Sequence, residues 1–260
     1  MSIPWPSITQ FLDTVTAVGG TVPASLTDVV AARAAVRTWS PPQSEDIADV
    51  IKRGELTAAT THDVLDAALT APERQPQAVA QRAEWALADR AATLILGAAG
   101  DAILTSVKAA HSAAVTKMTA ARDVLPASTT AAEALEIDGG VAAWRDLAEA
   151  RAVLDKIHSL VDTLLISFDA LGSPEDWMKG YARGYLYAAM YTNGVDGPIH
   201  RVGEILNTAD GGMRYRGGRW HLGPNYLHLN TLTEAKAIIT AHRQQAAERR
   251  AAEYAATHSG

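Results

Sequence analysis

Residues 141–171, VAAWRDLAEARAVLDKIHSLVDTLLISFDAL, carry the clearest periodic pattern in the chain. Apolar residues recur there at alternating spacings of three and four, which is the a/d stripe of a heptad repeat. The stripe consists of Leu147, Ala150, Leu154, Ile157, Val161, Leu164, Phe168 and Leu171. The pattern predicts a long helix whose apolar seam packs against another helix as in a coiled coil.

The segment before it supplies an obvious partner for this seam. After Pro76 there is no proline until Pro126, and helix-forming residues dominate the stretch between them. We therefore expect one very long helix or two nearly collinear ones, with Gly97 and Gly100 as the points where a kink would fall. An alanine-rich face would allow a tight antiparallel hairpin within one chain, and pairing between chains is the alternative.

Composition fits a mainly α-helical protein. Alanine is the commonest residue, the formal net charge of the 260 residues is −6, and there is no cysteine. These values argue against a wholly basic nucleic-acid coat and exclude disulfides and thiolate metal sites. The first ten residues do not resemble a secretory signal, and no apolar run is long enough for a bilayer. We expect a soluble chain without a membrane partner, cytoplasmic, or in a virion if a phage encodes it.

Proline and glycine residues, which interrupt helices, divide the chain into four parts. Short helices are expected in 1–72, and the long helical hairpin in 73–172. An aromatic helix and a connecting loop should occupy 173–210, and this helix should lie at the junction between the hairpin and the C-terminal unit. Residues 211–260 should form a β-meander followed by a helix.

The meander is predicted from two glycine-rich turns. Gly217-Gly218 favours a two-residue hairpin, and 223–225 favours a second turn into a third strand, 226–230. A capping box at 231–234 then begins a helix that would cover the apolar side of this three-stranded antiparallel sheet. Alternation leaves the other face basic and aromatic, with Arg214, Arg216, Arg219, His221, Tyr226 and His228 as candidates for binding DNA or a protein partner.

Gly218-Arg219-Trp220 followed by Thr231-Leu-Thr-Glu-Ala-Lys236 resembles the arm-site DNA-binding domain of phage tyrosine integrases. The resemblance covers about the last fifth of the chain, and in that family the domain is N-terminal. It implies that the exposed sheet face enters the major groove through the arginines, His221 and Tyr226. The whole chain also resembles a structural protein of a phage that infects high-GC bacteria.

Catalytic and metal-binding motifs are missing. There is no HExxH, GxSxG, GxxxxGK[ST] or GxGxxG, so we expect no catalytic residues, no metal and no cofactor. His158 lies at helical spacing from Asp155 and Asp162, which could form half a metal site. A polar stripe outside the heptad seam is the favoured interpretation.

Two functions lead at this level, ahead of an enzyme with an unrecognised site. The first is a non-enzymatic structural or assembly protein that acts through protein–protein contacts in a homo-oligomer or a larger assembly, such as a phage virion. The alternative is a DNA-binding protein that uses the basic sheet face, which would make nucleic acid its partner. The polar tail, 242–260, is either a frayed terminal helix or an arm that binds a partner.

Overall fold

The computed structural model describes residues 3–39, 76–126, 129–172, 182–192, 220 and 227–258. Helices account for most of this part of the chain, and it contains no β-strand. The elements are α1 (Trp5–Ala17), α2 (Ala24–Thr38), α5 (Pro76–Ile95), α6 (Ala98–Val124), α7 (Ala131–Glu136), α8 (Gly140–Asp162), the π-helical turn η1 (Thr163–Ser167), α9 (Ala182–Tyr191) and α11 (Leu232–His258). The prediction of a mainly α-helical chain is confirmed.

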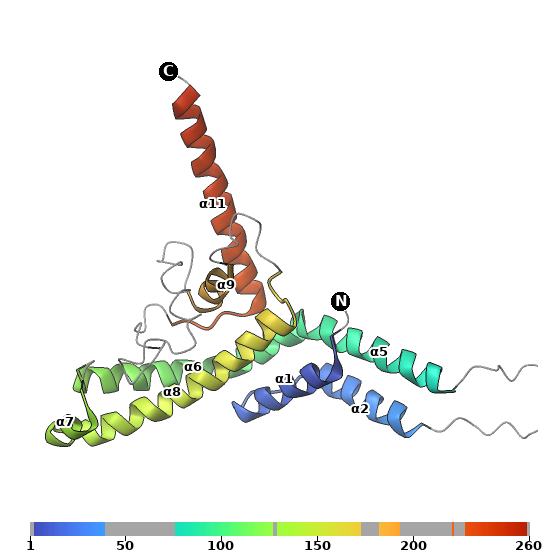
Figure 1. Cartoon of the computed structure of the whole chain (residues 1–260), viewed down its shortest axis with the longest axis horizontal. Coiled ribbons are helices and arrows are strands. Elements are labelled where there is room, and N and C mark those ends of the chain that lie inside the picture. Colours follow the sequence, from blue (N-terminus) through green and yellow to red (C-terminus); the bar gives the residue numbers. More distant parts are fainter. Residues whose placement is uncertain are drawn as a thin grey trace, which may run out of the picture.

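Helices α6 and α8 pack along their lengths as two arms of a hairpin that α7 closes at one end (Figure 1). The apolar seam of α8 is buried, with Leu154, Ile157 and Val161 fully covered. The opposing face of α6 buries Ile103, Val107 and smaller alanines, which let the two helices approach closely. Pairing therefore occurs within one chain.

Helices α5 and α6 meet at a sharp bend instead of lying collinear. Their axes differ by 52° across the break, so the expectation of one very long helix or two nearly collinear ones is wrong. The break itself falls at Gly97 and Gly100, where a kink was expected. Gly100 explains part of this geometry, because a Cβ atom there would lie 2.0 Å from the carbonyl oxygen of Ile95. A residue without a side chain is needed for the backbones to approach so closely.

Helix α8 ends earlier than the heptad pattern predicts. Beyond Asp162 the chain forms the π-helical turn, in which the backbone N–H of Phe168 donates to the carbonyl of Thr163. Phe168 remains buried and its ring lies 5.4 Å from that of Phe11. Leu171, the last seam position, lies in the following turn and is only half-buried.

The two N-terminal helices pack onto the hairpin. The buried face of α1 consists of Trp5, Ile8, Phe11 and Val15, whose three- and four-residue spacing places them on one side of the helix. It contacts α5 and α8, while α2 contacts α5 (Figure 1). The indole N–H of Trp5 also donates to the carbonyl of Glu84 at 3.0 Å.

The predicted third strand is wrong. Residues 227–230 belong to no strand, and their neighbour is a helix end: the N–H groups of His228 and Asn230 donate to the carbonyls of Tyr191 and Met190. The last carbonyls of an α-helix lack partners within the helix, so the C-terminus of α9 takes the place of a neighbouring strand. With no strand in the residues that the structure describes, the resemblance to the integrase DNA-binding domain is overturned.

Among the described helices, none is by itself long and apolar enough to cross a bilayer. Helices α5 and α6 meet the length and hydropathy criteria only as a pair, across their bend.

Candidate interaction site

The first turn of α11 is fixed to α6. Thr231 and Glu234 form the capping box that the sequence predicts, with Thr231 N–H donating to the Glu234 carboxylate at 2.6 Å and Glu234 N–H donating to Thr231 Oγ1. The same carboxylate accepts a hydrogen bond from Lys108 Nζ at 2.7 Å. These contacts, with that of Lys108 first, lower the pKa of Glu234 below its usual value, so the ion pair is present at neutral pH.

Further along, α11 packs against α9. Ala235 and Ile239 are buried in this contact. The hydroxyl of Tyr185 donates to the carbonyl of Ile239 at 3.4 Å, and the Tyr185 ring lies 5.2 Å from that of His242. The expected position of the aromatic helix, at the junction of the hairpin and the C-terminal helix, agrees with these contacts.

Beyond Arg243, α11 leaves the rest of the protein. Residues 244–258, which we call the distal arm, form roughly four helical turns that extend away from the body (Figure 1). Every described residue of the arm is exposed except Ala246, which is half-buried. Tyr254 is 65% exposed and stacks on His258, with ring centroids 4.0 Å apart. The arm is thus a largely exposed continuation of a well-anchored helix.

A cluster of buried aromatic and histidine rings, the junction cluster, lies where α6, α8 and α9 meet. Tyr191 is at its centre, with ring centroids 5.9 Å from both His111 and His158 and 5.7 Å from Trp220. His158 also stacks on Tyr187 at 5.0 Å, and its Nδ1 is 3.3 Å from the Tyr191 hydroxyl. All five rings are buried, so the cluster joins the hairpin to the C-terminal unit.

Two aspartates of α8 hold the edges of the junction cluster. Asp155 accepts the indole N–H of Trp220 at 2.8 Å, and Asp162 accepts the Tyr187 hydroxyl. The interpretation of Asp155, His158 and Asp162 as an outward polar stripe is therefore wrong for His158, which is 7% exposed. Both carboxylates bind ring donors, and the described residues contain no group of three or more side chains suited to a metal ion.

His111 is the most perturbed group of the junction cluster. Burial, with the nearby His228 as a second cause, lowers its pKa from 6.5 to about 4. Its Nε2 atom has no hydrogen-bond partner among the described residues. The ring is therefore neutral at neutral pH.

Sequence reasoning missed His111, although a signal was available. Its spacing of four from Val107 and three from Ala114 places it on the buried face of α6. Of the residues predicted on the basic sheet face, only His228 is described, and its side chain is exposed. The others, Arg214, Arg216, Arg219, His221 and Tyr226, lie outside the described residues.

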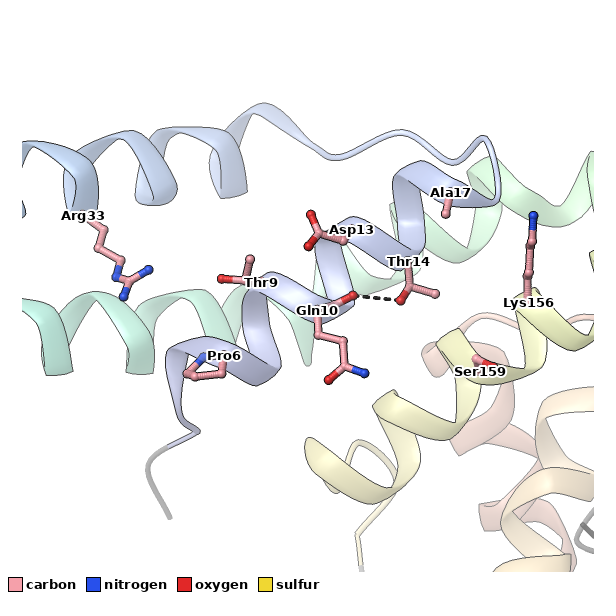
Figure 2. A pocket seen from close by; sticks show the side chains of 9 residues that line it. All are labelled: Pro6, Thr9, Gln10, Asp13, Thr14, Ala17, Arg33, Lys156 and Ser159. Carbon is pink, nitrogen blue, oxygen red and sulfur yellow. Dashed lines mark hydrogen bonds between the residues drawn. The ribbon is translucent and has the colours of Figure 1, made fainter.

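An open groove of about 700 Å³ runs along α1 (Figure 2). One face of α1 lines it with mostly short side chains, among them the carboxylate of Asp13. Arg33 of α2 lies at one end of the groove, and Lys156 and Ser159 of α8 lie at the other. The Arg33 guanidinium stacks 4.4 Å above the Trp5 ring, which holds this cation in place. The groove and the distal arm are two features of the described surface that an interaction could use.

Comparison with known proteins finds no matching family model, curated protein or solved structure.

Proposed function

We propose that this chain is a non-enzymatic assembly protein that acts through protein–protein contacts in a homo-oligomer or a larger assembly. The observation that carries the proposal is the distal arm, a helical segment in which every residue but the half-buried Ala246 is exposed and which continues from a firmly held base. Isolated helices of this length are marginal in water, because most helical stability in proteins comes from packing of one face. A partner would supply that packing.

The base of α11 prepares the arm for binding. The capping box, the Lys108 ion pair and the buried Ile239 fix the direction in which the arm leaves the body. A helix fixed in advance loses less conformational freedom on binding than a disordered segment would. Helix-in-groove recognition is a common use of such an element, and an exposed tyrosine such as Tyr254 is typical of interface anchors.

The alternative of DNA binding through a basic sheet is not carried forward. It depended on a three-stranded unit, and the described residues contain no strand.

A proline in the arm tests the proposal. Ala252→Pro should break the exposed helix, at a cost of roughly 3 kcal/mol to the local helix, without removing a buried contact. We expect the intact chain to associate at micromolar concentration in sedimentation velocity, and the variant to sediment as a monomer with an unchanged melting temperature. Ala251→Gln, which retains the helix and lies on a different side of the arm, is the control and should associate normally. A monomeric intact chain would contradict the proposal.

A further inference from the structure

We propose that the groove along α1 receives the distal arm of α11 from a second copy of this chain. The inference rests on the proposed function and names the partner and both surfaces of the contact. It depends on the lengths, the side-chain sizes and the charges of the groove and the arm.

The groove is suited to binding one helix. Its α1 side is formed by Pro6, Thr9, Gln10, Asp13, Thr14 and Ala17, which recur every three or four residues on one helix face. Eleven residues of rise give it a length of roughly 16 Å. The side chains along it are mostly short, so an approaching helix with small residues could lie close to α1.

The arm offers a matching face. On a helix, Gln245, Arg249, Ala252 and Ala256 share one side, over the same eleven-residue rise. All four are exposed. The two alanines at the distal end of this stripe permit close backbone approach, as the groove requires.

The charges of the two surfaces alternate in opposite senses. Along the groove the order is cation, anion, cation: Arg33, then Asp13, then Lys156 (Figure 2). Along the arm it is anion, cation, anion: Glu248, then Arg249, then Glu253, with the two glutamates on either side of the stripe. Asp13 and Lys156 form no ion pair within the described part of the chain, so both are available to a partner.

The arm of the same chain does not reach this groove. Helix α11 rises from one side of the hairpin, whereas α1 and α2 lie along the other (Figure 1). Two different surfaces of each copy would therefore be used, and such head-to-tail contacts produce rings when the rotation closes and open filaments when it does not. A chain of contacts of this kind suits an assembly protein.

Single cysteines can test the contact directly, because the natural chain has none. Gln10→Cys places a thiol in the centre of the groove, and Ala252→Cys places one in the centre of the arm face; both sites are exposed. After the two full-length variants are mixed under mild oxidation, we expect a disulfide-linked heterodimer several times more abundant than either homodimer. Ser112→Cys, on an exposed part of α6, replaces the groove variant as the matched control and should show no such enrichment.

Charge reversal gives a second measurement. Lys156→Glu and Glu253→Lys should each weaken self-association in sedimentation velocity. A mixture of the two variants should recover it, because both contacts between unlike variants bring opposite charges together. Arg122→Glu and Asp123→Lys, exposed at the end of α6 and without ion pairs among the described residues, are the controls. A dominant Ala252→Cys homodimer, or association without the mixed cross-link, would overturn the groove contact while leaving the proposed function standing. Absence of any association would remove both.

Discussion

Trp220 and Asp155 lie 65 positions apart in the sequence, and the indole N–H of the first donates to the carboxylate of the second at 2.8 Å. The tryptophan side chain is 1% exposed. A polar N–H buried to this extent costs free energy unless it has an acceptor. The carboxylate on α8 therefore fixes a residue of the C-terminal region onto the helical hairpin.

Removal of that acceptor should destabilise the fold. We expect Asp155→Ala to lower the free energy of unfolding by about 1–3 kcal/mol, because the indole N–H would remain buried without a partner. Chemical denaturation, followed by tryptophan fluorescence, measures the change. Asp138→Ala, at an exposed aspartate in the turn before α8, should have almost no effect. Equal stability of the two variants would show that the indole bond contributes nothing.

The bend between α5 and α6 should be sensitive to a single methyl group. In Gly100→Ala, the new Cβ would overlap the Ile95 carbonyl oxygen and press against Leu232 Cδ1 at 3.1 Å. Backbone cannot move as easily as a side chain, so we expect a loss of roughly 1–3 kcal/mol. Gly97→Ala is the matched control, because its Cβ would meet nothing closer than 3.4 Å. The urea midpoints of both variants measure the loss of stability. A larger loss in Gly97→Ala than in Gly100→Ala would contradict the assignment of the steric constraint to Gly100.

The helical hairpin could be predicted from the sequence because the pattern that indicates it lies within short, continuous segments. The heptad stripe predicts that Leu154, Ile157 and Val161 lie on one face, and all three are buried. The glycines also indicate where the long helix breaks. The 52° angle could not be predicted, because the surroundings of the bend include residues far away in the chain, such as Leu232 beside Gly100.

The C-terminal region shows why the predicted third strand is not found in residues 227–230. Alternation of Leu227 and Leu229 correctly predicts that both are buried. Alternation of apolar side chains does not identify the hydrogen-bond partner of the backbone, which here is the end of α9. The amide of Asn230 completes the link by donating to the carbonyls of Ala189 and Thr192, both at 2.7 Å. The side-chain amide of Asn230 thus helps to hold this segment in place, a role that was expected of a neighbouring strand.

The junction cluster escaped prediction for a similar reason. His111 and His158 lie on different helices, and the spacing of each residue indicates only which face of its own helix it occupies. Their common neighbour, Tyr191, belongs to a third helix. Sequence periodicity carries no information about which faces of separate helices meet.

His111 should make stability depend on pH. Its pKa is about 4 in the folded protein and 6.5 ordinarily, so the unfolded chain binds the proton more readily between these values. Stability should be unaffected by this group above pH 6.5 and should fall as the pH drops toward 4, by about 3 kcal/mol in total. The free energy of unfolding, obtained from urea denaturation across that range, should fall with decreasing pH. In His111→Phe, which retains an aromatic ring beside Tyr191, this dependence should be weaker by the uptake of up to one proton on unfolding. If the variant and the natural chain had the same pH slope, the acid sensitivity would belong to other groups.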